Sequence, residues 1–365
     1  MPDARVPDAA VPDAAVPTTP ESTNFAINAA HDNAQPADSV QSPLAPRWTA
    51  SFTGTVLYPL VIDGLVIVTA AESQPNVRAL DINTGARVWG PLVFGSPVTI
   101  AYDSGRVYAL DQDGHLTALD VMTGIRLWSI QIPGQPFYWS PPVAAGGMVY
   151  VNGLGSGGTT VAIDGQTGTV RWQAGTFDGS DGCVAVAGGV VYEAEACDQL
   201  TAWNALTGVR LWMHSGNCTG GGGAAPAFYD NMIWERDWAE GNIVIDHNGN
   251  AVGTFAASAI PAFHAGTVFY QSGGTVSAVD IATDTLLWSF AGDGHICTSP
   301  VVAGAGAQVF VGSSSGNVYE LDEATGAQRS VHQLSTPVTC FSEDESMAIG
   351  EGRLVVPAGN DLAVY

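Results

Sequence analysis

A thirteen-residue segment, LTALDVMTGIRLW, ends at Trp128 and returns in altered form about every forty residues until the chain ends. Each copy alternates apolar and polar residues, breaks at Asp-x-x-Thr-Gly, and alternates again into a tryptophan. This pattern is typical of a β-hairpin. The glycine supplies a positive φ, while Asp and Thr can hydrogen-bond the local backbone, so the residues suit a tight turn. The other full copies are VRALDINTGARVW, TTVAIDGQTGTVRW, LTAWNALTGVRLW and VSAVDIATDTLLW, and the degraded copies are NIVIDHNGNAVGTF, with Phe255 in the tryptophan position, and VYELDEATGAQRSV.

A second strand pair precedes each hairpin, and its first strand begins at eight places, from YPLVI at 58–62 to SMAIG at 346–350. Each unit is therefore a meander of four short strands, the unit of a β-propeller blade. The last unit is one strand short, and PRWTASF at 46–52 can supply the missing outer strand. We predict an all-β, eight-bladed β-propeller over residues 47–365, closed by N- and C-terminal strands paired in one blade.

The first 46 residues differ from the rest of the chain. They begin with a Pro-Asp-Ala repeat and contain only Phe25 and Ile27 as sizeable apolar groups. Such a segment lacks the apolar surface needed to fold. We predict that residues 1–46 are a disordered tether whose removal leaves stability unchanged, with a lipid anchor as one use of it. The alternative is a plain disordered terminus.

The charge balance limits the classes of partner. The chain of 365 residues has a net charge of −24, and no stretch approaches 18 uninterrupted apolar residues. This field repels phosphate backbones and anionic membrane surfaces. We therefore predict no nucleic-acid partner, no transmembrane segment, and a monomer.

The repeat ALDxxTGxxxW resembles that of the pyrroloquinoline-quinone-like (PQQ-like) propeller family, over the whole of the predicted propeller. In size the chain is closest to the non-enzymatic outer-membrane assembly lipoprotein type. The resemblance also implies quinone-dependent dehydrogenases, which are longer, carry adjacent cysteines, and bind calcium through Glu, Asn and Asp. No two cysteines are adjacent here. We predict a non-enzymatic propeller that is secreted or tethered to the cell envelope and binds a protein or glycan. The alternative is a quinone- or metal-dependent oxidoreductase of the PQQ dehydrogenase type.

The two faces of the predicted disc differ in the length of their connections. The turns between strands one and two, and between three and four, are short and share one face, which we call the turn face. The opposite face, which we call the loop face, has the longer and more varied connections, where propellers place binding residues. The candidate binding residues there are Phe137, Tyr138, Trp139, Phe177, Asp181, His214, Arg236, Trp238, His295, Glu343 and Asp344. The alternative is that each side chain covers only its own blade.

The repeat tryptophans have a different predicted role. They share one repeat position, which indicates packing between blades rather than binding. They are Trp89, Trp128, Trp172, Trp212 and Trp288.

All five cysteines fall on the predicted loop face. We predict one disulfide between Cys183 and Cys197 and a second between Cys297 and Cys340, which leaves Cys218. Disulfides favour an extracytoplasmic location; the alternative is buried thiols in a reduced protein.

Metal-binding motifs are weak in this sequence. CxxC and HExxH are absent, so we predict no metal and no cofactor, with PQQ or calcium as the less favoured alternatives. DQDGH at Asp111 and DHNGN at Asp246 space oxygen ligands as calcium loops do, but both also fit ordinary hairpin turns.

Overall fold

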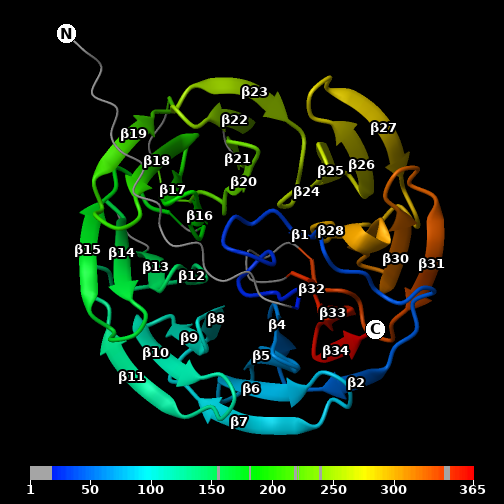
Figure 1. Cartoon of the computed structure of the whole chain (residues 1–365), viewed down its shortest axis with the longest axis horizontal. Helices are drawn as coiled ribbons and strands as arrows, with labels where there is room; N and C mark the ends of the chain where they lie inside the picture. Colours follow the sequence, from blue (N-terminus) through cyan, green and yellow to red (C-terminus); the bar gives the residue numbers. More distant parts are fainter. Residues whose placement is uncertain are drawn as a thin grey trace.

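The computed structural model describes residues 19–153, 157–180, 182–217, 220, 222–237, 241–340 and 346–365. Eight antiparallel sheets surround a central axis (Figure 1), which confirms the predicted eight-bladed propeller. In seven of the sheets the four main strands follow chain order from the axis to the rim, and in the eighth the outermost strand comes from the N-terminal part of the chain. The 3₁₀ helix η1 (Gly304–Gly306) is the one helix among the described residues.

The blades are built from the following strands. Blade 1 has β4 (Leu60–Ile62), β5 (Leu65–Ala71), β6 (Asn76–Asp81) and β7 (Arg87–Val93), with the short β3 (Thr55–Val56) paired to β5. Blade 2 has β8 (Val98–Asp103), β9 (Arg106–Asp111), β10 (His115–Asp120) and β11 (Arg126–Gln131). Blade 3 has β12 (Val143–Ala145), β13 (Met148–Gly153), β14 (Thr159–Asp164) and β15 (Val170–Gly175). Blade 4 has β16 (Ala185–Ala187), β17 (Val190–Glu195), β18 (Gln199–Asn204) and β19 (Arg210–His214).

The second half of the ring continues in the same way. Blade 5 has β20 (Ala227–Tyr229), β21 (Met232–Glu235), β22 (Asn242–Asp246) and β23 (Ala251–Phe255). Blade 6 has β24 (Ala262–His264), β25 (Thr267–Ser272), β26 (Thr275–Asp280) and β27 (Thr285–Phe290). Blade 7 has β28 (Val301–Ala303), β29 (Gln308–Gly312), β30 (Asn317–Asp322) and β31 (Gln328–Gln333). Blade 8 has β32 (Ala348–Gly350), β33 (Arg353–Ala358) and β34 (Asp361–Val364), with β2 (Trp48–Ser51) as its outer strand.

Ring closure takes place in blade 8. Strand β2 pairs antiparallel with β34, from Trp48 opposite Val364 to Ser51 opposite Asp361. The N- and C-terminal strands therefore share one blade, as predicted, and each covers an edge that the other would leave unpaired.

At the rim, each repeat tryptophan forms a hydrogen bond from its own blade to the next blade. The indole N–H of Trp172, for example, donates to the carbonyl of Ala205 in the next blade's outer hairpin turn, with Nε1 and O 2.9 Å apart. The same bond recurs from Trp48 to Ile82, Trp89 to Val121, Trp128 to Gly165, Trp212 to His247 and Trp288 to Glu323. The repeat tryptophans thus lie between blades, in agreement with their shared position.

The glycine of the Thr-Gly turn lies against this tryptophan. Gly208 has a φ of +67°, and a Cβ placed on it would lie 2.6 Å from the indole ring of Trp172. Blade 5 departs from the pattern, because its hairpin turn is shorter and Gly253 stands opposite Val244 where other blades have tryptophan. The placement of Phe255 in that position was wrong. Blade 6 correspondingly has Asp284 where the other turns have glycine, since no indole covers it there.

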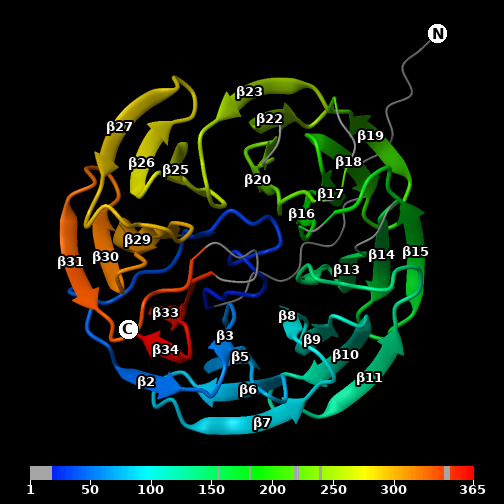
Figure 2. The ribbon, with the colours of Figure 1, turned by 180° about the vertical axis from the view of Figure 1, so that it is seen from behind.

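The centre of the propeller is filled by the chain's own residues 20–35, which we call the axial segment (Figures 1 and 2). Its strand β1 (Ala34–Gln35) pairs parallel with β28, and Phe25 and Ile27 are buried. The axial segment makes hydrogen bonds to the inner strand of every blade. In ring order these contacts are Ser22 with Val61, Thr23 with Tyr102, Asn24 with Ala144, Ala29 with Val186, Ala30 with Phe228, Asp32 with Phe263, Asn33 with Val302 and Ser22 again with Ile349.

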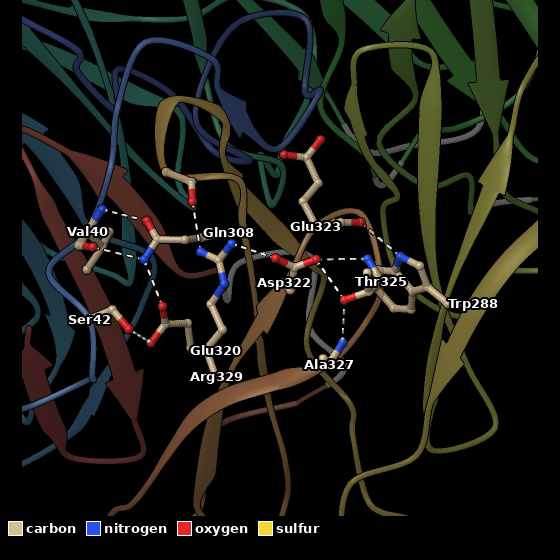
Figure 3. A network of polar contacts seen from close by, with 11 residues as sticks. Val40, Ser42, Trp288, Gln308, Glu320, Asp322, Glu323, Thr325, Ala327 and Arg329 are labelled. Carbon is tan, nitrogen blue, oxygen red and sulfur yellow. Dashed lines mark hydrogen bonds and ion pairs between the residues drawn. The ribbon is translucent and has the colours of Figure 1, made fainter.

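Residues 36–46, which we call the radial segment, run from the axis to the rim between blades 7 and 8. The backbone of Val40 exchanges two hydrogen bonds with the Gln308 side chain, each 2.8 Å long (Figure 3). Ser42 Oγ donates to Glu320, and Leu44 N donates to Ser330 Oγ. Ser330 stands eight residues after the turn aspartate of blade 7, where other blades have tryptophan. The radial segment therefore takes the place of the missing indole.

The prediction of a disordered tether over residues 1–46 is wrong for residues 19–46, and its remaining part lies outside the described residues. The hydropathy argument failed because the surface at the axis is only partly apolar. The inner strands present the unpaired peptide groups of their edges to the axis, and these groups need polar partners. Backbone, Ser22, Asn24 and Asn33 supply them.

Candidate functional site

The connection that enters blade 3 displays two aromatic side chains on the loop face. Phe137 and Trp139 are 51% and 55% exposed, whereas Tyr138 between them is buried. The Tyr138 N–H donates to Gln112 O, its hydroxyl donates to Pro133 O, and its ring lies against Gly114. Tyr138 thus fixes the connection to blade 2, and its two neighbours point outward. The sequence had placed Tyr138 itself among the binding residues, and the structure gives it an anchoring role instead.

The next connection, which enters blade 4, displays a third aromatic side chain. Phe177 is 63% exposed. Its neighbour Asp178 is held at the backbone N–H by Glu195 and at the carboxylate by Gln199, with contacts of 2.7 and 2.5 Å. Gly158, from the loop between strands two and three of blade 3, donates to the carbonyl of Asp178. We call Phe137, Trp139 and Phe177 the aromatic patch; its members lie on two neighbouring connections that flank blade 3.

The other candidates do not join this patch. His214 is the last residue of β19, and its Nδ1 lies 3.2 Å from Gly249 O in the outer turn of blade 5. Arg236 is buried and donates to Ser258 O. His295 is exposed on the connection between blades 6 and 7. Asp181, Trp238, Glu343 and Asp344 lie outside the described residues.

The cysteines pair differently from the first prediction. Cys183 is a buried thiol, so the Cys183–Cys197 disulfide is wrong. The Cys183 side chain lies at the axis, where its Sγ is 3.7 Å from Nε2 of His31 in the axial segment. Cys197 is disulfide-bonded to another cysteine, and Cys218 lies outside the described residues. A disulfide joins Cys297 and Cys340, with Cα atoms 5.4 Å apart, as the second predicted pair requires.

Blades 4 and 5 also bury a group of carboxyls that sequence reasoning missed. Its members lie on β17, on β21 and in the loops that follow these strands, and none is more than 9% exposed; they are Glu193, Glu195, Asp198, Glu235 and Asp237. Glu193 accepts hydrogen bonds from Thr160 and from the Trp203 indole. Both carboxyl oxygens of Glu235 lack a hydrogen-bond partner in the described part of the chain. The sequence signal was Glu-Ala-Glu in a strand whose counterparts are apolar.

Burial dominates the titration of this group. Desolvation raises the pKa of Glu193 to about 8, and the nearby Glu195 carboxylate adds to the rise. Burial, followed by the charges of Asp198, Asp237 and Glu195, raises the pKa of Glu235 well above its ordinary value. Burial therefore favours the protonated form of both glutamates.

The two calcium-like sequences form hairpin turns. The Asp111 carboxylate accepts from the His115 backbone N–H, and Asp246 accepts from the N–H groups of Asn248 and Asn250. Over the described ranges, no three His, Cys, Asp or Glu side chains are grouped so that they could hold a metal ion. No helix in the described part of the chain is long and apolar enough to span a bilayer.

Comparison with known proteins places this arrangement in a family. The model of the family described as outer membrane protein assembly factor BamB matches residues 42–212, 134–232 and 229–365. BamB from Moraxella catarrhalis is similar in structure, with a TM-score of 0.66 and 19% identity over 88% of this chain and 99% of that one. Quinohemoprotein alcohol dehydrogenase from Comamonas testosteroni has a TM-score of 0.71 and 16% identity, over 94% of this chain and 80% of that one.

A computationally designed protein, Ika8, is also similar, with a TM-score of 0.69 and 18% identity over 91% of this chain and 99% of that one. No curated protein matches this chain by sequence. At these identities the structural likenesses show a shared fold.

Proposed function

Because the chain belongs to the family of outer membrane protein assembly factor BamB, we propose that it is a non-enzymatic, extracytoplasmic propeller that binds a protein partner through the aromatic patch. The observation that carries this proposal is the exposure of Phe137, Trp139 and Phe177, which leaves more than half of each side chain in water. Large aromatic side chains dominate the energy of protein interfaces, and leaving them in water without a partner is unfavourable.

The patch is also prepared for binding before a partner arrives. Tyr138 fixes the first connection at both its N–H and its hydroxyl, and Asp178 fixes the second through five hydrogen bonds. A preorganised surface loses little conformational entropy on association, so more of its contact energy is available for affinity.

The charge of the chain indicates the chemistry of the partner. The propeller has a net charge of −24 with the tail included, and its aromatic patch carries no charge of its own. The partner surface that fits is an apolar centre with a rim of Arg and Lys, because the opposite fields speed association.

Two observations support an extracytoplasmic location. The Cys297–Cys340 disulfide suits an oxidising compartment, and the family description names the outer membrane. Extracytoplasmic placement would also give the aromatic patch access to envelope proteins.

Two further observations support a role other than catalysis. The axial segment occupies the propeller centre, where buried Phe25, Ile27 and His31 take up the space between the inner strands. The adjacent cysteines expected of quinone dehydrogenases are absent from the sequence. The described residues therefore do not fit pyrroloquinoline quinone on the axis. Adding the quinone with calcium should give no bound absorbance band, and a band that survives gel filtration would favour the oxidoreductase alternative.

The direct test is crosslinking in an envelope fraction. A triple variant, Phe137→Ser, Trp139→Ser and Phe177→Ser, should lose the crosslinked partner while keeping its melting temperature, since all three side chains are exposed. The matched control replaces three exposed leucines at the rim, Leu127→Ser, Leu211→Ser and Leu287→Ser, and should keep the partner. Equal capture by both triple variants would contradict the proposal.

A further inference from the structure

Glu193 and Glu235 occupy the same repeat position in successive blades. Each is the fourth residue of its blade's second strand, and both are 0% exposed. The position faces the preceding blade, since Glu193 accepts a hydrogen bond from Thr160 of blade 3. In the other six blades it holds Val68, Ala109, Val151, Tyr270, Val311 and Val356. Blade 4 therefore has a carboxyl on each side, where the other blade junctions have aliphatic groups or a tyrosine.

Glu235 differs from a buried glutamate that is built for structure. Neither of its carboxyl oxygens has a hydrogen-bond partner in the described part of the chain. Glu320 of blade 7 is also 0% exposed, but both of its oxygens accept hydrogen bonds, from the side chains of Ser42, Gln308 and Ser330. A buried carboxylate without donors is far more costly than the neutral acid, so the packing around Glu235 suits the neutral form alone.

The charged groups that act on Glu235 are all acidic. They are Glu195 on β17, Asp198 in the loop after β17, and Asp237 in the loop after β21. Arg236, the next residue in the chain, donates instead to the connection between blades 5 and 6. An ionised Glu235 would therefore meet like charges on both sides of the junction between blades 4 and 5.

The loops beside Glu235 connect this junction to the aromatic patch. Cys197 N donates to the Asp237 carboxylate at 2.8 Å, which joins the loop of blade 4 to that of blade 5. Glu195 in turn accepts from Asp178 N at 2.7 Å, and Asp178 belongs to the connection that displays one side chain of the patch. Separation of blades 4 and 5 at their loop-face ends would therefore disturb that connection.

We propose that Glu235 is a pH-sensitive switch: the neutral acid keeps the loop-face ends of blades 4 and 5 packed together, and loss of its proton opens them. Burial raises the pKa of Glu235 well above its ordinary value of 4.5 in the closed form, whereas water restores the ordinary value in the open form. The closed form is therefore fully stabilised below about pH 4.5 and loses stability as pH rises toward the raised pKa. The switch does not depend on a partner; only its effect on the aromatic patch rests on the proposed function.

The test measures hydrogen–deuterium exchange of the full chain at pH 5 and pH 7, with rates corrected for the intrinsic effect of pH on exchange. Protection of the amides at 195–199 and 233–237 should fall by about tenfold or more between the two pH values, because opening releases one proton. Protection of β29 in blade 7, which packs beside the fully hydrogen-bonded Glu320, should stay within about twofold.

Two neutral variants assign the effect to one side chain. Glu235→Gln keeps the shape of the side chain and should remove the fall in protection. Glu235→Met, which is apolar and of similar length, should do the same and serves if the glutamine variant folds poorly. The matched control, Glu320→Gln, changes a buried glutamate of blade 7 and should keep the fall in blades 4 and 5.

The aromatic triple variant should also keep the fall, which separates the switch from the proposed function. Three results would overturn the switch: equal protection of the wild type at pH 5 and pH 7, a fall of the same size in both Glu235 variants, or an equal fall in β29, which would indicate loosening of the whole ring.

Discussion

At the rim of the propeller six of the eight blades are each joined to the next blade by one indole, whereas at the axis all eight blades contact a single peptide segment. The rim bonds are copies of each other, from Trp48 to Trp288, and each joins only two blades. The axial segment contacts the inner strands of every blade in ring order. A mutation at the rim should therefore destabilise only the two blades it joins, while loss of the axial segment should destabilise all eight blades.

The two regions also differ in the chemistry they use. The rim buries an aromatic ring and adds one hydrogen bond, so its stabilisation comes mainly from apolar burial. At the axis, the eight inner strands have unpaired peptide groups along their edges. Backbone groups and short polar side chains of the axial segment form hydrogen bonds with them. Its stabilisation comes from satisfying peptide groups that would be poorly satisfied in a narrow channel.

The largest expected effect is loss of the axial segment. Deleting residues 19–45 should cause aggregation or the loss of a cooperative thermal transition, because eight inner-strand edges become exposed together. Gel filtration and near-UV circular dichroism measure this. Adding a peptide of residues 19–45 in trans should restore part of the transition.

The matched deletion removes residues 2–18, which lie outside the described residues, and should leave the melting temperature within about two degrees. If the 19–45 deletion behaved in the same way, the axial contacts would contribute little and the comparison of axis with rim would fail.

At the rim we expect a smaller and more local effect. Trp172→Ala removes a side chain that is 9% exposed and its bond to Ala205. It should lower the free energy of unfolding by about 3–5 kcal/mol, the range for burying an aromatic side chain, and leave a cooperative monomer. Urea denaturation measures the change.

Trp139→Ala is the control for tryptophan removal, since that indole is 55% exposed, and it should cost under about 0.5 kcal/mol. A loss of cooperativity in Trp172→Ala would show that the rim bonds act on the whole ring, against the expectation stated above.

The rim could be predicted from the sequence, and the axis could not. The Asp-x-x-Thr-Gly turn and the tryptophan eight residues after its aspartate recur with the same spacing, so strand order, blade count and closure follow from local rules. The axial segment has no repeat of its own. Its role depends on eight strand edges that come together only when the ring closes.

The site shows the same division. Exposure of Phe137, Trp139 and Phe177 follows from long connections on one face, which the sequence indicates. The sequence could not show that Tyr138 anchors its connection or that Cys183 does not pair with Cys197. Both depend on the direction in which a side chain points. Glu193 and Glu235 were missed since carboxyls in a buried strand contradict the usual pattern.

The smallest expected effect compares two aspartates across pH. Burial raises the pKa of Asp32 in the axial segment to about 6, while hydrogen bonds from Thr283 lower the pKa of Asp280 in the outer turn of blade 6. For Asp32 the folded chain holds the proton more tightly than the unfolded chain, so stability falls as pH rises from about 4 through about 6. For Asp280 the sign is opposite, and stability falls as pH drops.

Asp32→Asn keeps an oxygen that can accept from Asn28 and Ala34 N, as Asp32 does now. It should therefore match the wild type at pH 4 and exceed it by about 1–2 kcal/mol at pH 8, after allowance for solvent screening. Asp280→Asn should instead lose stability at pH 8. Urea denaturation at pH 4, 6 and 8 measures both. If the two variants changed stability with the same sign at pH 8, the pKa values of Asp32 and Asp280 would not be shifted in opposite directions, and this prediction would be wrong.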